Sequence, residues 1–202
     1  MAIRSARFVD YEKSQRARLE LLRRHCRGRV LDIGFCQFPV SLSENIAELH
    51  GIDKCSPEAP PDGYVATSVI DLDREDIPYP DGFFDTVVAG EIAEHLSLPM
   101  RMIMESNRVL RKDGLLLLSS PSPLYYLEVV SRLLGRELCK EHLMLFDGQA
   151  MKKCLGTCGF HVEKVIGYNF WIPGLKIGFV NTSATLPELL TWQQVYLCGK
   201  CG

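Results

Sequence analysis

Carboxylates follow four consecutive strand patterns in this chain, at the position where each pattern ends. Asp32 closes the first pattern and Asp53 the second, Asp71 and Asp73 follow the third, and Glu91 follows the fourth. The carboxyl ends of parallel strands meet at one edge of an open sheet, and ligands bind at that edge. A carboxylate after a single strand is common in loops, but four in succession predict a binding site.

The spacing of these groups suits a cofactor that contains adenosine. Gly34 directly follows the first strand pattern, and a glycine there lets the backbone turn sharply and come close to a ligand. Asp53 lies 19 residues after Gly34, a separation at which an acidic residue binds the hydroxyls of a ribose. Asp71 or Asp73 could accept a hydrogen bond from the amine of adenine, and the pattern does not decide between them. A dinucleotide is not favoured, because a Gly-x-Gly-x-x-Gly motif is absent.

Strand and helix patterns alternate along the chain and must position these side chains. Strand patterns cover residues 29–33, 50–53, 64–70, 84–89, 115–118, 160–166 and 194–198. Helix patterns, recognised by apolar residues at helical spacing, cover residues 11–25, 39–49, 98–111, 124–134 and 149–157. This alternation predicts an α/β, Rossmann-like, doubly wound fold with a mostly parallel seven-stranded sheet and helices on both faces. No clear helix separates the last two strands, which predicts an antiparallel terminal strand.

The composition is that of a single globular domain, with residues 1–28 expected as a helical cap and 29–202 as the core. The 202 residues are 47% hydrophobic and 24% charged with a net charge of −2, which excludes a disordered chain and disfavours general nucleic-acid binding. No apolar run approaches the roughly 20 residues of a membrane span, and no secretion signal is recognised. The basic N-terminal helix pattern is interpreted as a solvated face, with a lid for an acidic substrate as the alternative. The composition leaves the oligomeric state open.

Eight cysteines are interpreted as reduced thiols in a cytoplasmic protein, because a chain of this length can build its core without disulfides. Cys154 and Cys158, at helical spacing, could form a zinc site with Cys198 and Cys201. The second pair lies at the end of the chain, and no pattern brings the two pairs together. Buried thiols are therefore favoured, and no metal ligand is assigned.

Seven segments resemble, in order and spacing, the motifs of class I S-adenosylmethionine-dependent methyltransferases, in the small-molecule branch that includes the ubiquinone and sugar types. The resemblance covers roughly residues 28–166. Each segment alone is a loose match, whereas their order and spacing together are specific. The segments are Val30–Gly34, Gly51–Asp53, Asp76–Asp85, Glu91–Leu96, Arg108–Leu118, His142–Phe146 and Cys158–Phe160.

The resemblance implies S-adenosyl-L-methionine as the cofactor and methyl transfer by direct displacement. The acceptor it implies is a small molecule, a glycan or a lipid intermediate. A base is needed only for a protonated acceptor, and His95 and His142 are the candidates, with a structural or capping role as the alternative for each. The implied cofactor-binding residues are Asp32, Gly34, Phe35, Cys36, Asp53, Lys54, Asp71, Leu72, Asp73 and Glu91.

The chain departs from this family in the loop after the first strand. The family pattern is Gly-x-Gly-x-Gly, whereas this loop reads Gly34-Phe35-Cys36-Gln37-Phe38. Cys36 stands where the family keeps a glycine, and a cysteine does not readily adopt a positive φ. The departure supports an alternative in which the chain keeps the fold but acts as a non-catalytic partner or scaffold. The four carboxylates favour the enzyme.

Overall fold

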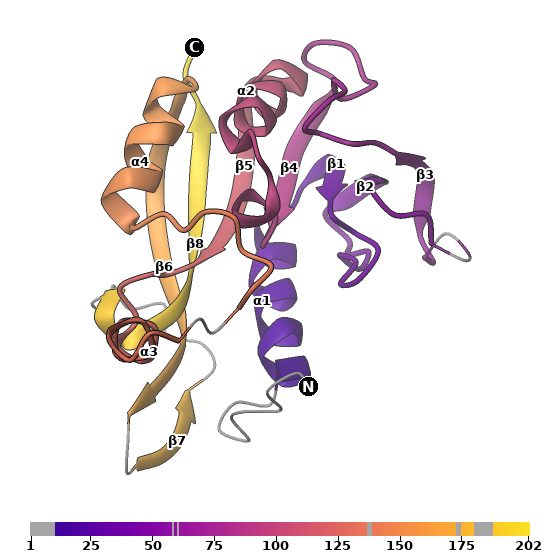
Figure 1. Cartoon of the computed structure of the whole chain (residues 1–202). Helices are drawn as coiled ribbons and strands as arrows, with labels where there is room; N and C mark the ends of the chain where they lie inside the picture. The colour runs from indigo at the N-terminus through magenta and orange to yellow at the C-terminus, as the bar shows by residue number, and fades with distance from the viewer. Residues whose placement is uncertain (1–10, 58, 60, 137–138, 173–174, 180–187) are drawn as a thin grey trace.

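The computed structural model describes residues 11–57, 59, 61–136, 139–172, 175–179 and 188–202. Eight strands form one mixed sheet in the order β3-β2-β1-β4-β5-β8-β6-β7 (Figure 1). The strands are β1 (Gly28–Ile33), β2 (Ile46–Asp53), β3 (Tyr64–Val69), β4 (Phe84–Gly90), β5 (Leu110–Pro121), β6 (Phe160–Ile172), β7 (Leu175–Phe179) and β8 (Thr191–Lys200).

The sheet confirms the predicted doubly wound arrangement. All neighbours from β3 to β5 pair in parallel, and β8 runs antiparallel to both β5 and β6. All seven predicted strands are present, and β8 is the predicted antiparallel terminal strand. The short strand β7 pairs antiparallel with β6 and extends the edge of the sheet.

Helices cover both faces of the sheet. They are α1 (Tyr11–His25), α2 (Pro99–Val109), α3 (Tyr126–Leu133) and α4 (Gly148–Thr157), with short 3-10 turns η1 (Ala93–His95) and η2 (Glu188–Leu190). Figure 1 shows α2 and α4 in front of the sheet. Leu22 of α1 belongs to a second hydrophobic core, separate from the core that holds residues of α2 and α4.

Central strands carry continuous apolar runs because each strand serves both cores. Val87, Leu116 and Leu118 pack in the core that contains α2 and α4, whereas Val88 and Leu117 pack in the core that contains α1. Successive side chains of a strand point to opposite faces, so a strand covered on both sides needs apolar residues at every position. This accounts for the uninterrupted Leu115–Leu118 pattern.

The predicted helix over residues 39–49 is wrong. Residues 34–45 form turns and loop, and β2 begins at Ile46. Ile46 and Leu49 imitate a helical stripe, but both are buried in the core that contains α1 because the pairing of β1 with β2 shifts register between them. Such a shift places two residues of odd spacing on one face of a strand. Leu42, the third member of the supposed stripe, is 48% exposed.

The carboxyl ends of the parallel strands lie at one edge, as expected. The N–H of Gly34 donates to the carbonyl of Ile52 (2.8 Å), and the N–H of Ile70 donates to the carbonyl of Asp53 (2.8 Å). Beside them the N–H of Glu91 donates to the carbonyl of Ser119 (3.0 Å). These bonds continue the ladder past the last strand residues, so the segments that follow β1 to β4 leave the sheet side by side.

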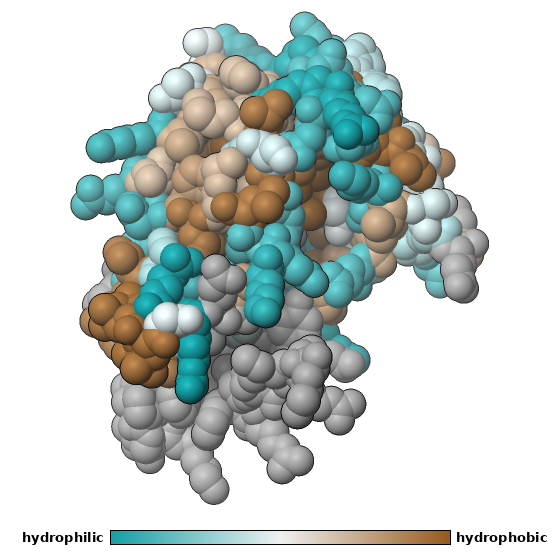
Figure 2. Space-filling model, in the orientation of Figure 1, coloured by the Kyte–Doolittle hydropathy of each residue, from teal (hydrophilic) through white to brown (hydrophobic). Residues whose placement is uncertain are grey.

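Helix α3 follows the carboxyl end of β5 and exposes apolar side chains. Val130, Leu133 and Leu134 at its end are 48%, 81% and 66% exposed. Figure 2 shows the corresponding brown patch where Figure 1 places α3. In the part of the chain that the structure describes, none of the helices combines the length and apolar character that crossing a membrane requires.

Candidate functional site

Two adjoining cavities open at the carboxyl edge of the sheet, and both are lined by Gly34, Ile92 and His95. The first, here called the strand-end cavity, is formed by the ends of β1, β2 and β3. Its walls are Ile33, Gly34, Ile52, Asp53, Lys54, Ile70, Asp71, Leu72, Asp73, Ile92, His95 and Leu96. The second, the helix-side cavity, has walls of Gln15, Arg18, Gly34, Gln37, Phe38, Gly90, Glu91, Ile92, Glu94, His95, Pro121, Cys139, His142, Trp192 and Gln193.

Gly34 stands where the two cavities meet, and only glycine fits there. Its φ is +84°, and an added Cβ would lie 2.2 Å from Cδ1 of Ile92. A side chain would therefore suffer both backbone strain and a direct clash. The sequence predicted this position from its place after the first strand.

Asp53 organises the loop that lacks the second glycine. Its Oδ2 accepts a hydrogen bond from the N–H of Cys36 (2.9 Å), and its Oδ1 accepts one from the N–H of Cys55 (2.9 Å). Each carboxylate oxygen keeps a further lone pair, since an ionised carboxylate offers about four acceptor positions. Asp53 thus holds two backbone segments and still faces the strand-end cavity.

Cys36 occupies the position of the second family glycine without a left-handed backbone conformation. Among the described residues, the non-glycine positions with positive φ are Glu91, Asp113 and Asn169. The Cys36 thiol donates to the carbonyl of Cys55 (3.1 Å). Loss of solvation and the charge of Asp53 raise the pKa of this thiol to about 12, so it stays protonated and is a poor nucleophile.

The segment after β3 contributes two carboxylates in different settings. Lys54 Nζ lies 3.3 Å from Oδ2 of Asp71, so these two predicted residues form an ion pair at the cavity wall. Asp73 accepts hydrogen bonds from the N–H groups of Ser97 (3.1 Å) and Leu98 (2.9 Å), just before α2. Burial favours a higher pKa for Asp73, but these two N–H donors, together with the Ser97 side chain and the charge of Lys54, lower the pKa. Leu72, between the two carboxylates, is buried and forms part of the apolar wall.

Three residues predicted to bind the cofactor, Asp32, Phe35 and Cys36, line neither cavity. Oδ2 of Asp32 accepts hydrogen bonds from the Tyr64 hydroxyl (2.5 Å) and from the N–H of Val40 (2.8 Å). Burial raises the pKa of Asp32 to about 6. The ring of Phe35 is buried beside Tyr64 and fills the space above Gly51, where a Cβ would come within 2.7 Å of it. Asp32 and Phe35 therefore hold the loop after β1 through buried contacts.

Glu91 faces the helix-side cavity from the end of β4. Its φ is +58°, a strained conformation that the predicted strand-end position did not reveal. Its carboxylate accepts hydrogen bonds from Nε2 of Gln193 (2.6 Å) and from the Tyr168 hydroxyl (3.3 Å). Residues of β6 and β8 therefore fix the side chain of the residue that directly follows β4.

Arg18 is a site residue that sequence reasoning missed. It is 3% exposed, and its guanidinium donates to Gln15 Oε1 (2.8 Å) and to Ser119 Oγ (3.4 Å). An added Cβ on Gly90 would lie 2.0 Å from Nη1, so the glycine makes room for the arginine. The available signal was its position four residues before Leu22, on the apolar face of the helix rather than the solvated one.

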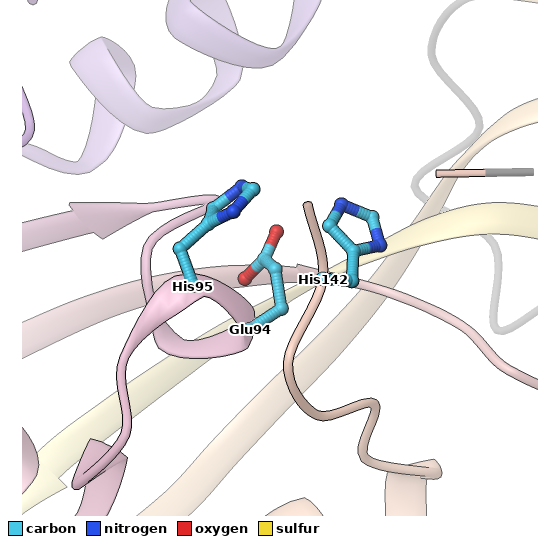
Figure 3. A group of neighbouring side chains, drawn as sticks. All are labelled: Glu94, His95 and His142. Atoms are coloured by element: carbon cyan, nitrogen blue, oxygen red, sulfur yellow. The ribbon is translucent and has the colours of Figure 1, made fainter. Parts of the chain in front are cut away.

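The two candidate bases lie together. The His95 and His142 ring centroids are 5.0 Å apart, and Nδ1 of His95 lies 3.1 Å from the carbonyl oxygen of Glu141. Burial, and then the neighbouring His95, lower the pKa of His142 to about 4. Figure 3 shows a third side chain, Glu94, with its carboxylate between the two imidazoles. Burial, reinforced by the charge of Glu91, raises the pKa of Glu94 well above its ordinary value.

The sequence matches known proteins over its first half. The sequence profile of the methyltransferase-domain family matches residues 31–118. A probable S-adenosylmethionine-dependent methyltransferase of Mycolicibacterium smegmatis is 31% identical over 94 residues, which are 46% of this chain and 34% of that protein. The chain thus matches about a third of the length of this relative. Together these matches imply S-adenosyl-L-methionine as the cofactor of the domain.

Solved structures show that the fold extends over nearly the whole chain. An S-adenosylmethionine-dependent methyltransferase of Thermotoga maritima has a TM-score of 0.71 at 16% identity, with 95% of each chain covered. A chain from the complex between the Haloferax volcanii Trm112 methyltransferase activator and a methyltransferase has a TM-score of 0.64 at 16% identity, covering 98% of this chain and 94% of that one. The [4+2]-cyclase SpnF has a TM-score of 0.59 at 16% identity, covering 93% and 80%. Since a cyclase shares it, this fold does not by itself define the reaction.

Proposed function

We propose that this chain is a methyltransferase that transfers the methyl group of S-adenosyl-L-methionine to a small-molecule, glycan or lipid-intermediate acceptor of the kind used by the ubiquinone and sugar methyltransferases. The observation that carries the proposal is Asp53, whose carboxylate faces the strand-end cavity while two backbone N–H groups hold it in place. The matched domain covers this residue and the glycine beside the cavity.

The strand-end cavity fits the adenosine part of this cofactor. Gly34 lets the backbone turn at the cavity wall with a positive φ, and Asp53 retains lone pairs for the two ribose hydroxyls. Ile33, Ile52 and Leu72 supply apolar walls for the adenine ring, whose amine would face Asp71 and Asp73. In this proposal Asp32 and Phe35 position the loop, and Cys36 contributes its backbone.

The helix-side cavity fits the cationic part of the cofactor and the acceptor. Glu91 directs a negative charge into it and suits the ammonium or sulfonium group. The bound cofactor supplies an activated methyl group, so the chain must chiefly align the acceptor with it. In this proposal His95 and His142 would take a proton from an acceptor that carries one.

The alternative of a non-catalytic scaffold loses its main support. It rested on the loop in which Cys36 and Phe38 stand in place of glycines, and at Cys36 that loop is held by Asp53 without a positive φ. All eight cysteines are free thiols, which supports our further proposal that the protein works in a reducing compartment such as the cytoplasm.

Calorimetric titration with S-adenosylmethionine and S-adenosylhomocysteine tests the proposal. The wild-type protein should bind both, and Asp53→Ala should weaken binding at least about 10-fold, because a hydrogen bond to a charged group contributes roughly 1.5–3 kcal/mol. Asp62→Ala removes an exposed carboxylate outside both cavities and should bind as the wild type does. No binding by the folded wild-type protein at millimolar ligand would overturn the function. Unchanged binding by Asp53→Ala would overturn only the ribose assignment.

A further inference from the structure

Three metal-binding side chains converge at the helix-side cavity. One carboxylate oxygen of Glu94, one ring nitrogen of His95 and one of His142 all lie within 4.8 Å of one another. Among the described residues, this is the one group of three or more such side chains that gathers this closely. Cys154, Cys158, Cys198 and Cys201, which the sequence offered as zinc ligands, do not form such a group among the described residues. Figure 3 shows the three side chains directed toward a common point.

Glu94 has no hydrogen-bond partner to explain its burial. The side chain is 0% exposed, and both carboxylate oxygens are buried without a partner among the described residues. A buried carboxylate is strongly destabilising unless it is paired, hydrogen-bonded or bound to a metal. His95 and His142, each with a ring nitrogen within 4.8 Å of a Glu94 carboxylate oxygen, are also ligands that transition metals prefer. A cation between them would satisfy the carboxylate that the protein leaves unpaired.

The backbone already holds the two segments in a suitable arrangement. The N–H groups of Leu143 and Met144 donate to the carbonyl oxygen of Glu94, at 2.8 and 3.2 Å. Nδ1 of His95 lies 3.1 Å from the carbonyl of Glu141, so Nδ1–H donates there and Nε2 keeps the lone pair. A second hydrogen bond of this kind is how proteins commonly orient a metal-binding histidine. The segment that contains Glu94 and His95 and the segment that begins at Glu141, 46 residues further on, are therefore joined by hydrogen bonds in both directions.

We propose that Glu94, His95 and His142 bind a divalent transition-metal ion, with a remaining coordination position open to the helix-side cavity. Two imidazoles and one carboxylate are a ligand set of catalytic zinc sites, in which a water or substrate oxygen fills the open position. Bonds of about 2.0–2.2 Å in a tetrahedral site place ligand atoms roughly 3.4 Å apart. Side chains within 4.8 Å therefore need only small rotations to close around the ion.

The position of this ion restricts which atom of the acceptor can be methylated. This step rests on the proposed methyl transfer. All three ligands line the cavity assigned to the acceptor, so an acceptor hydroxyl can take the open position. Coordination lowers the pKa of a bound hydroxyl, so with the ion bound His95 and His142 act as ligands rather than as bases, and the hydroxyl proton passes to solvent. The oxygen then forms a bond to the methyl carbon as the carbon–sulfur bond breaks, and the bonding pair stays on the sulfur. The site therefore favours an oxygen acceptor over carbon.

Titration of the chelator-treated full chain with Co²⁺ and Zn²⁺ tests the metal site. Calorimetry should give one site per chain, and the visible bands of bound Co²⁺ should show nitrogen and oxygen ligands without the near-ultraviolet bands of thiolate ligation. His142→Ala should weaken binding more than about 100-fold, beyond the 10- to 100-fold loss typical of residues that only support a ligand. Glu94→Gln, with folding checked by circular dichroism, should do the same.

His161→Ala provides the matched control, because this exposed histidine lies near Cys201 and Glu163, away from both cavities. It should bind metal as the wild type does. Absence of binding by the folded wild-type chain overturns the proposal, as does equal binding by His142→Ala. Loss of binding in His161→Ala would assign the metal elsewhere. Binding of S-adenosylhomocysteine to the metal-free chain is measured in parallel, so failure of the metal site is distinguished from failure of the proposed function.

Discussion

The strand-end cavity and the helix-side cavity share Gly34, Ile92 and His95 but are built in different ways. The first takes most of its walls from the ends of three adjacent parallel strands. Backbone N–H groups donate hydrogen bonds to its carboxylates Asp53 and Asp73. The second collects side chains from α1, η1, β8 and the segment that contains His142. Local sequence patterns therefore describe the strand-end cavity well, whereas the packing of distant segments determines the helix-side cavity.

A substitution at the shared position should damage both cavities and have the largest effect. Gly34→Val combines a positive φ with a clash against Ile92, and strain and overpacking contribute about 1–3 kcal/mol each. We expect the free energy of unfolding in urea to fall by about 4 kcal/mol and cofactor binding to be lost. Gly156→Ala in α4, where an added Cβ meets nothing within 4 Å, should instead stabilise the protein by up to about 1 kcal/mol. Equal effects of the two variants would contradict this account.

Asp32 holds the loop beside the strand-end cavity through Val40 and Tyr64. Its titration should change the free energy of unfolding. The folded chain holds the Asp32 proton up to a pH of about 6, above the ordinary value of 3.8 at which the unfolded chain releases it. The free energy of unfolding should therefore fall by about 3 kcal/mol as the pH rises from about 4 to 6, and this contribution should stay level above that range.

Asp32→Asn should remove this pH dependence, because one amide oxygen can accept from both Tyr64 and Val40. Urea unfolding of both proteins from pH 4 to pH 8 makes the comparison. Parallel curves for the variant and the wild type would show that another group is responsible.

Substitution of Arg18 should weaken ligand binding in the helix-side cavity and leave binding in the strand-end cavity unchanged. Arg18→Met leaves Gln15 and Ser119 without their buried donor, which lowers the free energy of unfolding by about 1–3 kcal/mol. Because the Arg18 guanidinium would attract the carboxylate of the cofactor, we expect S-adenosylmethionine to bind about 10-fold more weakly, equivalent to about 1.4 kcal/mol, while adenosine, which lacks that carboxylate, binds within about twofold of the wild type. Arg24→Met, on the exposed part of the same helix, is the control for titration calorimetry. A parallel loss of both ligands would mean that the cavities are not independent.

Cys36→Gly restores the second glycine of the family pattern and should have the smallest effect. The loop is already held by Asp53, so cofactor affinity should change less than about threefold, which corresponds to about 0.6 kcal/mol. Stability should fall by about 0.5–1 kcal/mol, because glycine loses more backbone freedom on folding. A large gain in affinity on calorimetric titration would show that Cys36 obstructs the cavity.

The strand-end carboxylates of the site, apart from Asp32, could be predicted because parallel strands bring their ends together whatever the details of packing. Asp53 and Gly34 stand where the spacing placed them, and Asp71 and Asp73 border the same cavity. The helix predicted over residues 39–49 failed because the three-residue spacing of Ile46 and Leu49 is shared by a helix and by a strand with shifted register. A periodicity over so few residues does not distinguish the two.

The sequence by itself determined the order of seven strands and four helices, the two-faced sheet and the edge that carries the carboxylates. These follow from periodicity and from turn residues, which act over a few neighbours. Only the tertiary structure decided that Arg18 is buried against Ser119, that Asp32 faces away from both cavities, and that His142 meets Glu94 and His95. Such contacts join residues 46 or more positions apart or depend on which face of a loop is buried, and no local pattern encodes either.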